Sequence, residues 1–255
     1  MNLISIYGVI YLVIYIKRAT IILILMTIVV IYLTITLYGK AIKPAFSGKK
    51  GITVIIDAGH GEPDGGTTGI TGSSENEINL EISKKISAKL KERCYNVIMT
   101  RETGDGIYTE GSSIREKKLS DMHRREGIIN GSDGDIFISI HMNSFSDPSV
   151  SGAQVFYSAN MEESKVLAEG IREKLIPLYE KNDRILKEAP EGVYLMKKSK
   201  IPACLIECGF LSNAENEALL LSCEYQDKVA EAIVIGIEEY FKGDANEKQN
   251  NVLLQ

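Results

Sequence analysis

Two hydrophobic patterns alternate along most of this chain. Short runs of β-branched and apolar residues predict buried strands, and longer stretches with an apolar residue every three to four positions predict amphipathic helices. Strands that alternate with helices are typical of an α/β fold in which a single, mostly parallel twisted sheet is flanked by helices. The strands are predicted at 52–56, 96–100, 136–140, 153–157 and 204–207, and the helices at 78–90, 112–130, 161–179 and 225–241.

The amino-terminal part of the chain has a different pattern. Residues 3–16 and 21–38 are almost wholly apolar and are separated by Lys17 and Arg18. The second run has roughly 18 residues, enough for a helix to cross about 30 Å of hydrocarbon. A basic pair before such a run places the following domain outside the cytoplasmic membrane. We interpret 1–39 as a membrane segment acting as an uncleaved signal anchor; a cleaved signal peptide, a hairpin of the two runs and an over-extended start are the alternatives.

Composition predicts one globular domain after this segment. The chain has 255 residues, 44% of them hydrophobic and 25% charged, with a net charge of −5. We place a linker at 40–50, the globular domain at 51–242 and a disordered polar tail at 243–255. No basic surface is predicted, which excludes nucleic acid as a partner. The four cysteines form no CxxC pair and are interpreted as small buried hydrophobes rather than a disulfide framework.

Ionisable residues stand where the predicted strands end or a helix begins. His60 follows the first strand between two glycines, His141 follows the strand 136–140, Glu207 ends the strand 204–207, and Glu75 precedes the helix 78–90. In open α/β sheets, ligands collect beyond the carboxyl ends of strands. Two imidazoles and a carboxylate are a ligand set of hydrolytic zinc sites, and a further carboxylate can activate water. These four residues therefore predict one shared site.

Each of these residues also has a structural interpretation when taken alone. A histidine at a strand end can be a hydrogen-bonded structural residue, Glu75 can favour the helix dipole, and Glu207 can be a buried salt-bridge partner. Asp57 either orients an imidazole or caps a turn. His123 lies among four basic residues and is interpreted as a solvated helix position. It is the conjunction of two histidines with two glutamates that favours a catalytic site.

Three blocks of sequence, in this order, resemble the zinc-dependent N-acetylmuramoyl-L-alanine amidases of bacterial cell walls. The first block comprises 56–61, Asp64-Gly65-Gly66 and 75–80, the second is 139–143 and the third is 206–213. The resemblance covers about 51–242, three quarters of the chain. Ala58 stands where the family usually has proline, and the loop around Thr67 is atypical, but neither position is a ligand.

The resemblance implies roles for the four residues. His60, Glu75 and His141 correspond to the zinc ligands of the family, and Glu207 corresponds to its catalytic glutamate. The short form, with no wall-binding repeats seen, resembles the germination-specific amidases of spore-forming bacteria. This implies removal of peptide side chains from muramic acid in spore-cortex peptidoglycan, before a muramic acid deacetylase acts on the way to muramic-δ-lactam and germination competence. The implied location is the extracytoplasmic face of the membrane, or the forespore or spore envelope.

The implied mechanism is metal-assisted amide hydrolysis. Zinc would lower the pKa of a water towards about 7, and Glu207 would take its proton and return one to the leaving L-alanine amine. One alternative is a zinc carboxypeptidase, in which Arg101 or Arg115 would bind a terminal carboxylate. Another is a membrane-tethered wall-binding protein without catalysis, which the presence of Glu207 disfavours.

A chain without wall-binding repeats is expected to be brought to its substrate by another protein. We predict an accessory envelope protein that docks on the catalytic domain and stabilises its zinc-bound form. The basic stretch 115–125 is one candidate surface for it, and a solvated helix face is the alternative interpretation of that stretch.

Overall fold

The computed structural model describes residues 51–179 and 182–253, together with positions 20, 23, 25–27 and 29 near the amino terminus. The chain divides into two units, Met1–Ser47 and Gly48–Gln255. Most of the predicted membrane segment (1–39) and all of the predicted linker at 40–50 lie outside the described residues. Within the described ranges, no helix is both long enough and apolar enough to cross a membrane.

The second unit is built on one six-stranded sheet with the strand order β2-β1-β3-β6-β4-β5. Strands β1, β2, β3 and β6 run parallel, β4 pairs antiparallel with β6, and β5 is parallel to β4. The predicted single sheet is confirmed, and its one antiparallel pair makes it mixed. The strands are β1 Thr53–Ala58, β2 Asn96–Met99, β3 Ile136–Asn143, β4 Gln154–Tyr157, β5 Lys187–Glu188 and β6 Ala203–Phe210.

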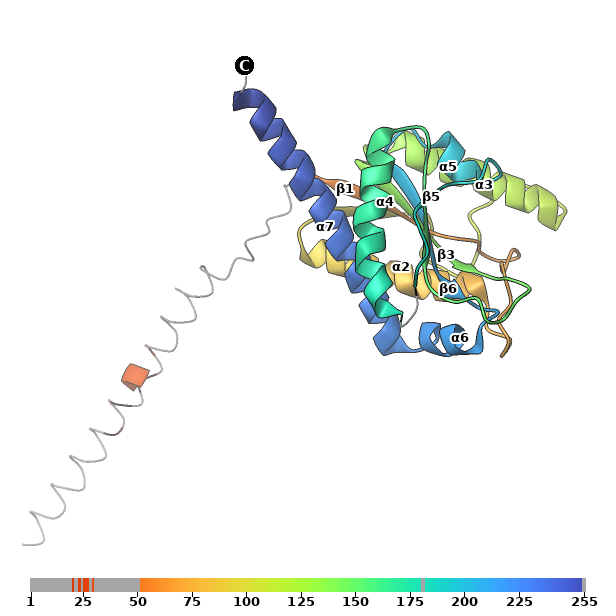
Figure 1. Cartoon of the computed structure of the whole chain (residues 1–255), viewed down its shortest axis with the longest axis horizontal. Helices are drawn as coiled ribbons and strands as arrows, with labels where there is room; N and C mark the ends of the chain where they lie inside the picture. The colour runs from red at the N-terminus through yellow and green to blue at the C-terminus, as the bar shows by residue number, and fades with distance from the viewer. Residues whose placement is uncertain are drawn as a thin grey trace, which may run out of the picture. The chain divides into compact units, whose positions relative to one another are not determined.

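Helices cover both faces of the sheet (Figure 1). They are α2 Glu75–Glu92, α3 Ile114–Gly131, α4 Glu162–Leu175, α5 Tyr194–Lys198, α6 Ala214–Leu220 and α7 Cys223–Leu253, with a 3-10 turn at Ile176–Leu178. Residues of α2, α4 and α7 share one large apolar cluster with the even-numbered positions of β1 and β3. Residues of α3 and α5 share a smaller cluster with the odd-numbered positions of the same strands. The fold therefore has three layers.

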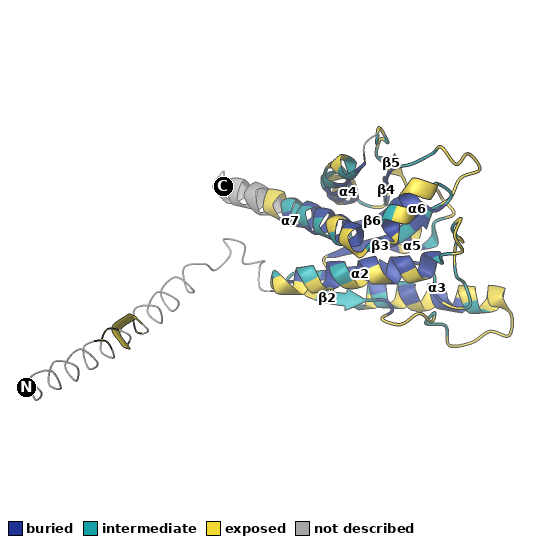
Figure 2. Ribbon diagram, turned by 90° about the horizontal axis from the view of Figure 1, so that it is seen from below, coloured by how far each residue is buried: buried dark blue, intermediate teal, exposed yellow. Residues whose placement is uncertain are grey.

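The two faces of the sheet are packed differently. On the larger side, α2 buries Ile78, Ile82, Ile86 and Leu90 at a spacing of four, and Figure 2 shows buried positions along both α2 and α7. On the other side, the buried positions of α3 are Ser120, Asp121, Arg125 and Ile129. Three of these four side chains are polar, and Arg125 bonds β1 directly, while Ile129 packs in the smaller apolar cluster.

Several element boundaries differ from the sequence prediction. The helix predicted at 161–179 ends at Leu175 and continues as a 3-10 turn, because Pro177 cannot supply a backbone donor. The last helix runs to Leu253, where a disordered tail from Gly243 was predicted. Residues 244–253 hold no proline, and Ala, Glu, Lys and Gln among them favour helix. Strand β5 and the short helices α5 and α6 were not predicted.

Candidate active site

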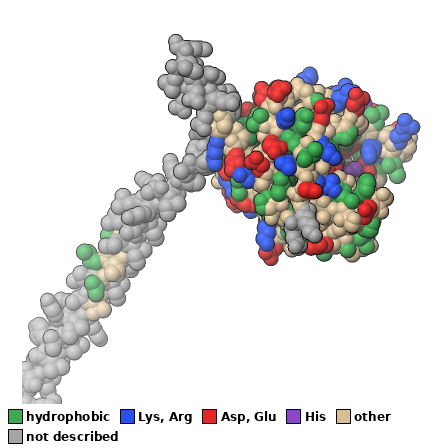
Figure 3. All heavy atoms as spheres, in the orientation of Figure 1, with side chains coloured by type: hydrophobic (Ala, Val, Ile, Leu, Met, Phe, Trp, Pro, Cys, Tyr) green, Lys and Arg blue, Asp and Glu red, His purple; other side chains and the backbone are tan. Residues whose placement is uncertain are grey.

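The ends of the central strands bring the predicted site residues to one edge of the sheet. His141 of β3 and Glu207 of β6 are paired across the two strands, so their side chains point to the same face. His60 lies two residues beyond β1, and Glu75 is the first residue of α2. All four line one open cavity of about 400 Å³. Histidine is visible at a hollow of the surface in Figure 3.

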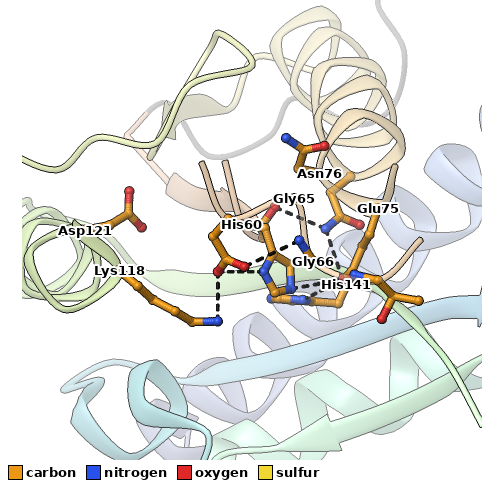
Figure 4. A network of polar contacts seen from close by, with 12 residues as sticks. His60, Gly65, Gly66, Glu75, Asn76, Lys118, Asp121 and His141 are labelled. Carbon is orange, nitrogen blue, oxygen red and sulfur yellow. Dashed lines mark hydrogen bonds and ion pairs between the residues drawn. The ribbon is translucent and has the colours of Figure 1, made fainter. Parts of the chain in front are cut away.

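Donor atoms of three of these residues converge on one point. Glu75 Oε1 lies 3.2 Å from His60 Nε2 and 3.1 Å from His141 Nδ1, and one donor atom from each residue lies within 4.8 Å of the others. Figure 4 shows the three side chains pointing toward one another. Two ligands of a tetrahedral zinc, each about 2.0–2.1 Å from the metal, lie about 3.3 Å apart. Both distances from the Glu75 oxygen therefore fit a zinc ion, and two nitrogens and an oxygen are ligands that zinc accepts.

The carboxylate of Glu75 is fixed by the backbone around it. Its Oε2 accepts from the Thr67 amide at 2.8 Å, and its Oε1 accepts from the Met142 amide at 3.1 Å and from Asn79 Nδ2 at 3.3 Å. Burial alone would raise its pKa, but the hydrogen bonds with His141 and His60 lower the pKa of Glu75 well below its usual range. Glu75 is thus ionised, and its carboxylate is held in one orientation by donors of the protein.

The ring of His60 is held from its other side. Its Nδ1 lies 3.0 Å from Asp64 Oδ2, which in turn lies 2.8 Å from Lys118 Nζ. In the neutral ring, a Nδ1–H directed at Asp64 leaves the lone pair of Nε2 facing Glu75. Burial lowers the pKa of His60, yet hydrogen bonds with Asp64 and Glu75 raise it to about 9. The sequence gives one sign of this partner, an aspartate four residues after the histidine.

Glu207 differs from Glu75 in having no such support. Its Oε2 is buried and has no hydrogen-bond partner among the described residues. Burial raises the pKa of Glu207 to about 7, with a further rise from Glu75 that is opposed by His141 and His60. A buried carboxylate with an unused oxygen, facing the same cavity as the three donors, suits the transfer of a proton.

Two glycines leave the space in which the site side chains lie. A Cβ at position 59 would stand 2.3 Å from the ring of His141, and one at position 66 would stand 2.5 Å from Glu75 Oε2. Gly66 also has a φ of +71°, in the left-handed region that favours glycine. The glycines near His60 therefore provide space for the side chains of His141 and Glu75, in addition to letting the chain turn.

Two buried arginines hold the loop that carries His60. Arg125 of α3 donates to Asp57 at 2.5 Å and to the Ala58 carbonyl at 2.8 Å, and it also donates to the His60 carbonyl and to Asp121. Arg101 donates to the Ala58 carbonyl at 2.8 Å and to the Gly59 carbonyl at 2.9 Å. Sequence reasoning missed this role for both residues, because nothing in their local pattern distinguishes a buried arginine from a solvated one.

The remaining candidates lie away from the cavity or are already engaged. Asp57 contacts Arg125, Thr100 and Ser139 rather than an imidazole, so it does not orient a histidine directly. His123 is exposed on α3, with its ring centroid 5.9 Å from that of Tyr194. The guanidinium of Arg101 is occupied by backbone carbonyls, which leaves it unsuited to a substrate carboxylate.

Comparisons with known proteins show the family to which this chain belongs. Residues 54–239 match the Amidase_3 family model, described as N-acetylmuramoyl-L-alanine amidase. The chain is 38% identical over 208 residues to the germination-specific N-acetylmuramoyl-L-alanine amidase of Bacillus subtilis, covering 80% of this chain and 87% of that protein. This chain belongs to the N-acetylmuramoyl-L-alanine amidase family, as its three sequence blocks indicated, and its enzyme class is confirmed.

Solved structures show the same fold. The CwlD amidase from Clostridioides difficile, determined in complex with the GerS lipoprotein, matches with a TM-score of 0.72 and 38% identity, covering 75% of this chain and 99% of that chain. An N-acetylmuramoyl-L-alanine amidase from Clostridium difficile 630 matches with a TM-score of 0.66 and 30% identity, covering 76% and 98% of the two chains. The described sheet and helices therefore form the catalytic fold of this family.

Proposed function

We propose that this enzyme uses zinc to hydrolyse the amide bond between N-acetylmuramic acid and L-alanine, and that its substrate is the peptidoglycan of the spore cortex. The observation that carries the zinc proposal is the meeting of His60, Glu75 and His141 donors within 4.8 Å at a cavity that Glu207 also lines. The cortex proposal is supported by the 38% identity to a germination-specific amidase.

His60 Nε2, His141 Nδ1 and a Glu75 oxygen would hold the metal. Bound zinc supplies a Lewis acid that polarises the substrate carbonyl and lowers the pKa of the attacking water. The carboxylate of Glu207, which lines the same cavity, takes a proton from that water. The carboxyl group then delivers the proton to the nitrogen of the leaving L-alanine, which would otherwise depart as an unstable anion.

The other residues of the cavity position these groups. Asp64 keeps the proton of His60 on Nδ1, so that Nε2 remains a donor to the metal. The amides of Thr67 and Met142 hold Glu75 at a fixed angle. The cavity is open to solvent, as cleavage within a polymeric substrate requires.

Replacing Glu207 by glutamine tests the proposed base. Glu207→Gln is nearly isosteric but cannot accept the proton, so turnover of purified cortex peptidoglycan should fall by about a hundredfold or more, while bound zinc stays at the wild-type level. Mass analysis of the released muropeptides and metal analysis of the same preparations provide the two readings. Near-normal turnover of the variant would remove Glu207 from the mechanism.

Metal content tests the proposed ligands. His60→Ala and His141→Ala should each lose zinc together with activity, because two remaining protein ligands hold zinc poorly. His123→Ala, the exposed histidine of α3, is the matched control and should retain both. Loss of zinc from the His123 variant alone would contradict the assignment of ligands.

The biological setting is part of the same proposal. The peptide-free muramic acid made by this enzyme would be the substrate of a muramic acid deacetylase that leads to muramic-δ-lactam, outside the cytoplasm in the forespore or spore envelope. An accessory envelope protein is supported by the relative whose structure was solved with a lipoprotein. Cortex from spores that carry Glu207→Gln in place of the wild-type enzyme should lack muramic-δ-lactam, and a normal lactam content would contradict the setting.

A further inference from the structure

We infer that Lys117 and Lys118, in the first turns of α3, form a subsite for a carboxylate of the peptide that the enzyme removes. This inference rests on the proposed location of the amidase reaction at His60, Glu75, His141 and Glu207. The peptide attached to muramic acid is an acid, because its second residue carries a carboxylate in the unamidated form. Lys117 and Lys118 would be the part of the protein that recognises this charge.

Lys118 brings a lysine charge to the lining of the cavity. Asp64, Glu75 and Glu207 place three carboxyl groups around the cavity, and among the described residues that line it Lys118 is the one lysine or arginine. The proposed zinc would offset the carboxyl groups at its ligands, whereas Lys118 carries its charge next to Asp64, on the Nδ1 side of the His60 ring. Lys118 is therefore the side chain of this lining that can meet a peptide carboxylate away from the metal.

Lys118 has donors left for a substrate. Its side chain is half exposed and extends from α3 toward His60 (Figure 4). An ammonium group has three donors, and the ion pair with Asp64, at 2.8 Å, occupies one of them. The other two are available to a second carboxylate on the cavity side.

Lys117 adds a second cation beside the first. Its Nζ lies 4.9 Å from the centroid of the Tyr108 ring, a cation–π contact that restricts the side chain. Among the described residues it makes no ion pair, so its charge is not neutralised by the protein. Lys117, Tyr108 and the exposed Ile114 line a small hollow of about 10 Å³ that shares His60, Asp64 and Lys118 with the lining of the catalytic cavity.

The chemistry of the peptide decides which carboxylate is meant. The carboxyl group of the L-alanine at the cleaved bond is used in the next peptide bond, so the second residue is the first that can present a free carboxylate. The Lys118 ammonium is linked to Nδ1 of His60 through one Asp64 oxygen, at 2.8 and 3.0 Å, whereas the proposed metal position is at Nε2. An extended peptide advances about 3.3–3.6 Å per residue away from that position.

Two substrates that differ at this carboxylate test the inference. They are disaccharide peptides identical except that the carboxylate of the second peptide residue is free in one and amidated in the other. The wild-type enzyme should show a kcat/KM about fivefold higher for the free acid, the size of one partly exposed charge-assisted contact. Lys117→Gln and Lys118→Gln should each reduce the ratio of the two kcat/KM values towards one. Lys117→Arg keeps the positive charge and should therefore retain the wild-type preference.

Zinc content shows whether a lysine variant acts on recognition of the peptide carboxylate or on the position of His60. Lys117→Gln does not touch Asp64, so its zinc content should equal that of the wild type while the substrate preference falls. Lys228→Gln, which removes an exposed lysine of α7, is the control and should keep the preference.

Two results would overturn the subsite. One is a wild type without preference for the free acid, and the other is an equal loss of kcat/KM on both substrates in the lysine variants. A wild-type enzyme that cleaved neither substrate would instead overturn the proposed function, and the subsite with it.

Discussion

The two faces of the sheet are made from the same strands but are held by different forces. Along β3, the residues on the α2, α4 and α7 side are Ile136, Ile138, Ile140 and Met142, which stay apolar to the end of the strand. On the α3 side, the series runs from Phe137 through Ser139 to His141. β1 and β6 change in the same way, from Ile55 to Asp57 and from Leu205 to Glu207.

This difference shows where stability and function are joined in the molecule. Most of the apolar face lies away from the cavity, which it meets at Glu75, the first residue of α2, and at Met142. On the polar face, Arg125 links Asp57 inside the sheet to the carbonyl of His60, so the same side chain supports the fold and the loop that carries a proposed ligand. We therefore expect substitutions on the polar face to change metal affinity, and those on the apolar face to change only stability.

The largest effect is expected for Arg125→Met. The variant leaves Asp57 and Asp121 without their buried cation, and removal of one partner of a buried ion pair costs about 3–5 kcal/mol. The loop at His60 also loses its donor, so zinc should bind at least tenfold more weakly in the folded fraction. Denaturant unfolding and zinc titration measure the two effects. Unchanged zinc affinity in folded protein would show that the loop holds its position without Arg125.

A somewhat smaller loss is expected for Ile86→Ala on the apolar face. Ile86 is fully buried in the larger cluster, and truncation of a buried isoleucine to alanine costs about 2–5 kcal/mol. Below the unfolding midpoint, zinc affinity and turnover per folded molecule should equal the wild-type values. A decrease in zinc affinity comparable to that of Arg125→Met would remove the distinction between the two faces.

The smallest of the three effects concerns pH. Burial raises the pKa of Asp57, but Arg125, Ser139 and Thr100 lower it to about 2, below the ordinary value of 3.8. A depressed pKa stabilises the folded state above pH 3.8, and this contribution of about 2 kcal/mol is lost as the pH falls towards 2. Asp57→Asn should lower stability at pH 7 and flatten the acid limb between pH 4 and 2. A parallel acid limb in unfolding curves of both proteins would contradict this.

The apolar face and the four site residues could be predicted from the sequence. Periodicity identified Ile78, Ile82, Ile86 and Leu90, because burial of apolar side chains imposes the helical repeat directly on the sequence. His60, His141 and Glu207 were found because an ionisable residue that ends an apolar run is a local signal. The roles of the site residues stay predictions that the experiments above address, and the domain boundaries stay predictions.

The polar face could not be predicted for a physical reason. The buried side of α3 carries Ser120, Asp121 and Arg125, which a sequence pattern interprets as solvated, and the stretch 115–125 was accordingly a candidate docking surface. A buried ion pair depends on a partner far along the chain, as with Asp57 and Arg125, so no local window contains it. The contact between Lys118 and Asp64 was missed for the same reason.

The space reserved by Gly59 and Gly66 has a consequence for how this enzyme tolerates mutation. Neither residue has a side chain that takes part in chemistry, yet a methyl group at either position would overlap His141 or Glu75. In a saturation screen scored by cortex hydrolysis, both positions should accept glycine alone, as strictly as the histidines resist replacement. Such a screen would report on shape as much as on reactivity, and a map of intolerant positions would overstate the number of residues that touch the substrate.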